Sequence, residues 1–106
     1  PLYKVLLVGA AHATELPYVW GNLGGPQDLT LKLGGAKTAT AVSARMQARW
    51  INFATHGSPD GLPGEPEWPR YHATEPACLV IDKYDAVHDV DARIRGAWGD
   101  RLVSFR

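Results

Sequence analysis

The chain has 106 residues, of which 45% are hydrophobic and 21% charged, and its 11 lysine and arginine residues balance its 11 aspartate and glutamate residues. This balance excludes the clustered basic surplus that a nucleic-acid surface requires, and no apolar run approaches the roughly 20 residues of a transmembrane helix. The single cysteine, Cys78, excludes an internal disulfide and a cysteine-based zinc site. The 11 glycines and 8 prolines exceed the usual share of about 12% for these two residue types together, which predicts long loops.

The first apolar segment covers residues 2–8 (LYKVLLV) and is ended by Gly9. A nearly continuous apolar run of this length predicts a strand, from Leu2 to Val8, that is covered on both faces. Such strands lie in mostly parallel sheets flanked by helices, and the sequence contains at most one comparable run. Because the chain also begins without methionine, we expect it to be a piece of a larger protein.

Two helices are predicted next. The first is short, from Thr14 to Trp20, with Pro17 confined to its first turn and Gly21 ending it. The second covers about Lys37–His56 and is amphipathic, with Gly57 placed as its C-terminal cap. Its expected core face consists of Ala39, Val42, Met46, Trp50, Phe53 and Ala54, and its expected outer face includes Arg45, Arg49, Asn52 and Thr55.

The remaining segments are loops and two short elements. Residues 22–35 predict an irregular loop because they are rich in glycine. Residues 63–76 are rich in proline and predict a segment without regular structure that lies on a surface. Residues 78–81 (CLVI) predict a short strand, and residues 91–98 predict a last helix that packs through Ile94 and Trp98.

Four histidines supply the only side chains whose ordinary pKa suits proton transfer near neutral pH. His56 is predicted at a helix C-terminus, where a cation complements the helix dipole, and His72 and His88 fall in polar segments that predict exposure to solvent. His12 differs because it follows the predicted strand by four residues and has small neighbours. Ligands of open α/β sheets bind beyond the carboxyl ends of the strands, so His12 is a candidate base, with a structural role or metal binding as alternatives.

The partners that such a base would need are missing from the sequence. The pair His12 and Glu15 has the spacing of two ligands on one helix face, but no second pair accompanies it, and Glu15 also fits a first-turn acid. None of Ser43, Ser58 and Ser104 lies in a Gly-x-Ser-x-Gly motif. Cys78 predicts a small core residue, because its segment is apolar and has no neighbouring base.

The segment around His12 resembles a motif of the type B carboxylesterases, which have the α/β-hydrolase fold. The family pattern G-x-x-H-x-x-E-[IL]-x-[FY]-V-[FW]-G is matched by Gly9, His12, Glu15, Leu16, Tyr18, Val19, Trp20 and Gly21. The likeness continues in the family's order through Met46-Gln47, Trp50, Asn52-Phe53-Ala54, Gly57, Pro59, Gly61, Trp68-Pro69, Tyr71, Leu79-Val80-Ile81-Asp82, Asp91, Arg93 and Trp98.

The resemblance implies that residues 1–106 are the C-terminal segment of an α/β-hydrolase catalytic domain, not a complete domain. Its elements would be a late sheet strand, the catalytic histidine loop, a long amphipathic helix, a short strand and a terminal helix. The parent would be a serine carboxylesterase that hydrolyses carboxylic esters and needs no cofactor or metal, with His12 as the triad histidine. Triads of this fold run in the order Ser, Asp or Glu, then His, so the serine and the acid would precede Pro1.

The resemblance also implies partners for the chain. By itself the chain would be inactive, and it would pair either with the preceding part of the same enzyme or with a second copy of itself through the strand Leu2–Val8. Two alternatives remain open, namely a binding or regulatory module derived from the same fold and a small metal-dependent enzyme that uses His12 and Glu15.

Overall fold

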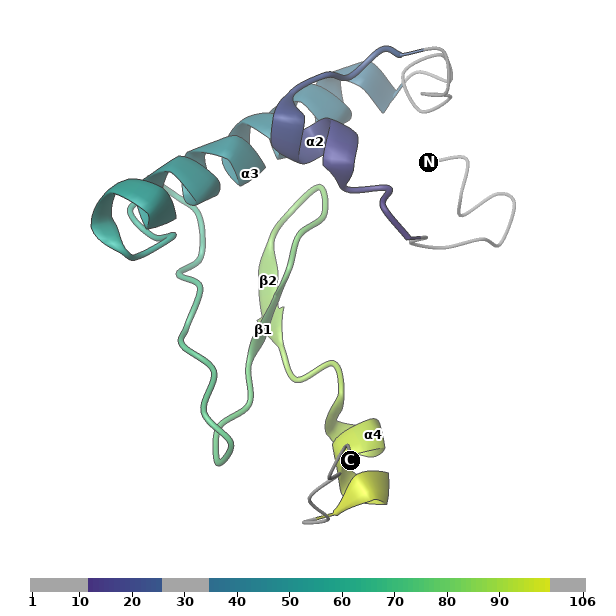
Figure 1. The fold of residues 1–106 in the computed structure, drawn as a ribbon, viewed down its shortest axis with the longest axis vertical. Coiled ribbons are helices and arrows are strands. Elements are labelled where there is room, and N and C mark those ends of the chain that lie inside the picture. The colour runs from purple at the N-terminus through teal and green to yellow at the C-terminus, as the bar shows by residue number, and fades with distance from the viewer. Residues whose placement is uncertain (1–11, 26–34, 100–106) are drawn as a thin grey trace, which may run out of the picture.

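The longest element of the computed structural model, which describes residues 12–25 and 35–99, is helix α3 (Ala36–His56; Figure 1). Its sequence is rich in alanine, the residue with the highest helix propensity. The helix ends at Gly57, whose φ of 74° lies in the left-handed region and whose N–H donates to the Phe53 carbonyl at 2.8 Å. The predicted helix and its glycine cap are therefore confirmed.

Helix α2 (Leu16–Trp20) lies alongside α3 (Figure 1). It is only five residues long, begins two residues after the predicted start, and has Pro17 in its first turn as expected. Gly21 ends it with a φ of 66° and donates its N–H to the Pro17 carbonyl. The predicted stop at Gly21 is confirmed.

The only strands within the described residues form an antiparallel hairpin below α3 (Figure 1). Strand β1 (Cys78–Val80) pairs with β2 (Ala86–His88), so that Cys78 lies opposite His88 and Val80 opposite Ala86. The strand predicted at residues 78–81 is confirmed, whereas β2 was not predicted. His88 was assigned to a polar loop and is instead an exposed strand residue, because pairing with β1 fixes a segment that has weak strand signals of its own.

Helix α4 (Ala92–Trp98) follows the hairpin and confirms the predicted last helix. Its packing differs from the prediction, since Ile94 and Trp98 are both exposed and no α4 residue is buried. Arg95 of α4 donates a hydrogen bond to the Asp89 carboxylate, and this bond is the main cause that raises the pKa of the Arg95 guanidinium above its usual value. The long segment between α3 and the hairpin has no regular structure, as predicted for residues 63–76.

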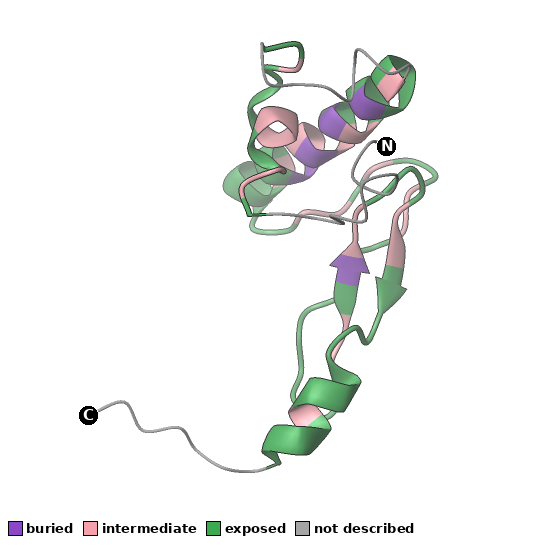
Figure 2. Ribbon diagram, turned by 90° about the vertical axis from the view of Figure 1, so that its right-hand side faces the viewer, coloured by how far each residue is buried: buried purple, intermediate pink, exposed green. Residues whose placement is uncertain are grey.

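The buried stripe of α3 corrects the predicted faces of this helix (Figure 2). Its buried residues are Ala39, Ser43, Met46 and Arg49. The prediction placed Arg49 on the outer face, yet this residue is buried, with 1% exposure, because carboxylates from other segments approach it. Trp50 and Phe53, predicted in the core, are 44% and 61% exposed.

Two predicted segments fall wholly or mostly outside the described residues, and one predicted core residue is exposed. The strand expected at Leu2–Val8 lies outside the described residues, as does most of the loop predicted at residues 22–35. Cys78 was predicted in the core and is exposed, because it stands at the open end of β1 while Leu79 takes the buried position. Within residues 12–25 and 35–99, no helix combines the length and hydropathy that a bilayer crossing needs.

Candidate active site

His12 opens the described part of the chain, in a turn that leads directly into α2. The residue is exposed. An exposed imidazole at the start of a tight turn is free of the packing that would bury both ring nitrogens. The His12 imidazole is therefore accessible for a hydrogen bond with a side chain from another segment of the protein.

The residue after His12 has an unusual backbone. Ala13 has a φ of 62°, and it is the only non-glycine residue with positive φ in the described part of the chain. A left-handed alanine costs about 1–2 kcal/mol, because its Cβ approaches the following carbonyl. Its own carbonyl accepts the Leu16 N–H at 3.3 Å, so the turn is closed by a hydrogen bond. Strain of this kind concentrates at functional sites, where the surrounding structure maintains it.

Two side chains of α3, Ser43 and Gln47, contact α2 and the glycine that ends it. The buried Ser43 hydroxyl donates to the Tyr18 carbonyl at 2.6 Å. One turn further along α3, the Gln47 side chain lies against Gly21, where a Cβ added to the glycine would stand 2.1 Å from Gln47 Nε2. The orientation of α2, and of the turn that begins at His12, thus depends on side chains of α3. Neither contact was predicted from the sequence.

The other candidate residues do not gather around His12. Glu15 is the N-cap residue of α2 and makes no side-chain capping bond. His56 is the last residue of α3, as predicted, and His72 is exposed in the segment before the hairpin. No group of three or more His, Cys, Asp or Glu side chains in the described ranges could hold a metal ion.

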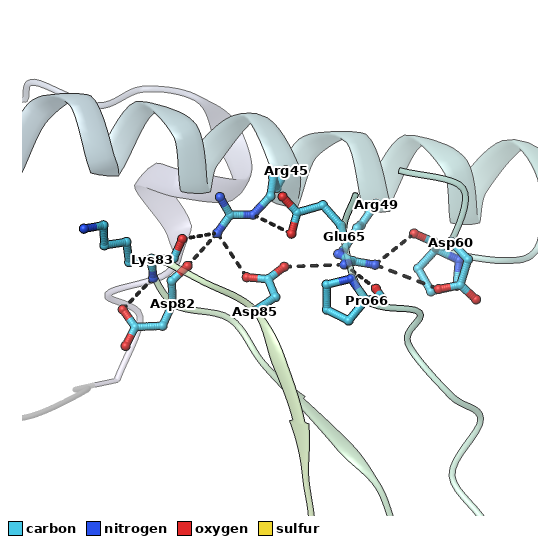
Figure 3. Close-up of polar contacts among 9 residues, drawn as sticks. Arg45, Arg49, Asp60, Glu65, Pro66, Asp82, Lys83 and Asp85 are labelled. Atoms are coloured by element: carbon cyan, nitrogen blue, oxygen red, sulfur yellow. Dashed lines mark hydrogen bonds and ion pairs between the residues drawn. The ribbon is translucent and has the colours of Figure 1, made fainter. Parts of the chain in front are cut away.

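A second polar assembly lies along α3, where the hairpin turn and the segment after the helix meet it (Figure 3). We name it the arginine cluster, and it consists of Arg45, Arg49, Asp60, Glu65 and Asp85. The Arg49 guanidinium donates to the Pro66 carbonyl at 2.8 Å and to Asp85 Oδ2 at 3.4 Å. Arg45 Nη2 donates to Asp85 Oδ1 at 3.1 Å and to the Asp82 carbonyl at 2.5 Å.

The arginine cluster connects three segments that are distant in sequence. Both guanidinium groups are engaged with carboxylates and carbonyls, so they hold the hairpin turn and the loop after α3 against the helix. The sequence contained a signal for the arginine cluster. Arg45 and Arg49 are four residues apart, so they share one helix face and repel each other unless an acid lies between them. The identity of that acid depends on the tertiary fold.

An aromatic groove of about 890 Å³ lies beside the C-terminal half of α3. The rings of Trp50 and Trp68 line it, with centroids 6.0 Å apart and planes tilted by 50°. Phe53 and Tyr71 also line it, and both are exposed. His12 is not among the lining residues, so this groove is separate from the candidate base.

Comparison with known proteins gives a consistent result. A family model described as the carboxylesterase family matches residues 3–94. The chain is 36% identical over 73 residues to para-nitrobenzyl esterase of Bacillus subtilis (strain 168), a match that covers 69% of this chain and 14% of that protein. It is 36% identical over 66 residues to fumonisin B1 esterase of Sphingopyxis macrogoltabida, covering 58% of this chain and 12% of that protein.

Solved structures agree with the sequence matches. A carboxylesterase of Geobacillus stearothermophilus, EST55, superposes with a TM-score of 0.71 and 34% identity over 85% of this chain and 19% of that structure. The fold is therefore part of an α/β-hydrolase. The chain belongs to the carboxylesterase family, and it spans less than a fifth of the length of these relatives.

Proposed function

We propose that this chain is the C-terminal segment of the catalytic domain of a serine carboxylesterase, and that His12 is the histidine of its catalytic triad. The observation that carries the proposal is the position of His12, exposed in a strained turn immediately before α2, within the motif that ends at Gly21. The family match over residues 3–94 supports an ester hydrolase, as does the similarity to two esterases. The substrate class is a carboxylic ester.

The proposed role of His12 is proton transfer in both halves of the reaction. During acylation, one imidazole nitrogen accepts the serine proton while the serine oxygen bonds to the ester carbonyl carbon. As the tetrahedral intermediate collapses, the same nitrogen gives the proton to the leaving alcohol, and the C–O bond to that alcohol breaks. A water molecule then repeats the sequence on the acyl-enzyme and releases the acid.

The remaining groups of the reaction come, in this proposal, from sequence before Pro1. They are the serine nucleophile, the acid that orients the imidazole and the donors that stabilise the oxyanion. The coding sequence upstream of Pro1 should therefore encode a Gly-x-Ser-x-Gly elbow followed by an acidic triad residue. A start codon directly before Pro1 would instead favour a non-catalytic module of the same fold.

Replacing His12 by alanine in the complete enzyme tests the assignment. With 4-nitrophenyl butyrate as substrate, kcat should fall by about 10³-fold or more, because triad members act as a unit, while KM changes little. His72→Ala is the matched control, since His72 is also exposed in a loop and should leave kcat unchanged. A loss confined to KM would show that His12 shapes the pocket and does not transfer protons. Hydrolysis by the 106-residue chain alone above the background of free histidine would also contradict the proposal.

A further inference from the structure

Helix α2 has no means of fixing its own orientation. It has five residues, none of them buried, whereas isolated helices shorter than about 12 residues are marginal in water. Its position must therefore come from tertiary contacts. Within the described residues, the element that packs against it is α3.

A buried polar contact between these helices is made by Ser43. Its side chain is buried, with 4% exposure, and its hydroxyl donates to the Tyr18 carbonyl at 2.6 Å, 25 residues away in sequence. A hydroxyl buried without a partner is costly, so this hydrogen bond is maintained wherever α3 covers Ser43.

The Tyr18 carbonyl is suited to accept this bond. It belongs to the last turn of α2, where carbonyls lack partners further along the helix. The two amides that follow the helix, those of Gly21 and Asn22, are both donated to the Pro17 carbonyl. Neither of these two amides is donated to the Tyr18 carbonyl, and the Ser43 hydroxyl supplies a donor for it.

The orientation of α2 is transmitted to His12 by a short and tightly bonded turn. The Glu15 carbonyl accepts the Tyr18 and Val19 amides at 2.9 and 3.1 Å, and the Ala13 carbonyl accepts the Leu16 amide at 3.3 Å. Ala13 is held in the left-handed region, which is a narrow conformational well for a residue with a Cβ. The turn has little freedom to absorb a movement of α2, so such a movement displaces His12.

We propose that Ser43 is a positioning residue for His12, acting through the Tyr18 carbonyl and α2. The inference rests on the proposed function, because it assigns a role relative to the triad histidine. A displacement of about 1 Å at a reacting group can reduce a rate 10²-fold. Loss of the Ser43 hydroxyl should therefore reduce kcat while the binding of substrate is retained.

Loss of this hydroxyl should leave the protein folded. The contact of Gln47 with Gly21 remains, as do the apolar contacts of α3 through Ala39 and Met46. Ser43→Ala is thus a suitable variant, and Thr40→Ala is its matched control, since Thr40 is exposed on the same helix. Ser43→Thr and Ser43→Val form a second pair, similar in shape, of which only threonine keeps a hydroxyl.

The experiment measures kcat and KM of these variants in the complete enzyme with 4-nitrophenyl butyrate, well below the thermal midpoint of each variant. Ser43→Ala should lower kcat by about 10-fold to 100-fold with KM changed less than about threefold, and Thr40→Ala should match the wild type. Threonine at position 43 should retain at least about ten times the kcat of valine there. A purely structural role would lower the thermal midpoint and leave kcat unchanged, which would overturn the proposal.

A variant combination separates this proposal from the proposed function. If Ser43 acts through His12, then adding Ser43→Ala to His12→Ala should cause no further loss of kcat. A further 10-fold loss in the double variant would show that Ser43 acts by another route. If His12→Ala itself keeps the wild-type kcat, the proposed function fails. If His12→Ala is inactive and Ser43→Ala is fully active, only the positioning role fails.

Discussion

Arg49 Nη2 lies 3.4 Å from Asp85 Oδ2, and both side chains are closed to solvent, with exposures of 1% and 0%. The second carboxylate oxygen of Asp85 accepts from Arg45 at 3.1 Å (Figure 3). One carboxylate on the hairpin turn therefore bridges two guanidinium groups of the same helix face, which Glu65 and Asp60 also approach, at 3.5 and 3.9 Å. Without it, two like charges one helical turn apart would share a poorly hydrated site.

The first prediction is that Asp85→Ala destabilises the protein strongly. Removing one partner of a buried ion pair costs about 3–5 kcal/mol, and Arg49 would then keep the more distant Asp60 carboxylate, at 3.9 Å. The control is Asp82→Ala, since the exposed Asp82 carboxylate accepts, among residues 12–25 and 35–99, a neighbouring backbone bond from Lys83 N–H. Urea denaturation should show a large fall in the free energy of unfolding for Asp85→Ala and a change of about 1 kcal/mol or less for the control. Equal effects of the two variants would show that the arginine cluster is not what secures the hairpin turn.

The second prediction concerns the left-handed backbone at Ala13. Glycine adopts a φ of 62° without steric cost, but it also gains freedom in the unfolded chain, so Ala13→Gly should change the free energy of unfolding by about 1 kcal/mol or less. Valine is β-branched and strongly disfavoured there, so Ala13→Val should cost about 1–3 kcal/mol.

The activity of the two Ala13 variants distinguishes a strained turn from an ordinary one. Under the proposed function, kcat should remain near the wild-type value for glycine and fall for valine, because valine shifts the backbone next to His12. Full stability and full kcat of Ala13→Val would mean that position 13 is not held in the left-handed region in the working enzyme.

Local chemistry explains which parts of the fold could be predicted. Pro17, Gly21 and Gly57 act on their own backbone neighbours, so the short helix, its end and the end of α3 were correctly predicted. Periodicity assigned part of the buried face of α3 correctly, since Ala39 and Met46 are buried as predicted, but it did not identify Arg49. Arg49 is buried because its guanidinium pairs with the Asp85 carboxylate. Asp85 lies 36 residues further along the chain, and the hydrophobic pattern of the helix carries no information about that pairing.

The candidate site also has features that the sequence could predict and features that it could not. The role of His12 stays a prediction from its motif, whereas the left-handed Ala13 and the bond from Ser43 to Tyr18 could not be predicted, because they arise only when α3 meets the turn. Strand β2 was not predicted for a similar reason, because its three residues form a strand by pairing with β1. Cys78 looked like a core residue by its neighbours, yet strand alternation assigns the buried side to Leu79.

The third prediction compares two glycines in the left-handed region. An added Cβ at Gly57 meets nothing within 4 Å, so Gly57→Ala should cost only the left-handed strain, about 1 kcal/mol. At Gly21 the added Cβ also meets Gln47 Nε2, so Gly21→Ala should cost more. Combining each change with Gln47→Ala provides the check by urea denaturation. The pair at position 21 should show a favourable coupling above about 0.5 kcal/mol, and the pair at position 57 should be additive. Additivity at both positions would mean that Gln47 does not contact Gly21.

The last prediction is that the 106-residue chain, expressed by itself, associates with copies of itself. The strand Leu2–Val8, the contact originally expected, lies outside the described residues, but α3 also presents an apolar surface formed by Trp50, Ile51 and Phe53, each between 44% and 64% exposed. Leaving apolar surface in water costs about 25 cal/mol per Å², and association removes that cost. Light scattering over a micromolar concentration series should show oligomers that weaken in Ile51→Glu and Phe53→Glu. Thr55→Glu adds the same charge at an exposed position of the same helix and should have a smaller effect. A well-folded monomer throughout the series would show that this surface needs no cover.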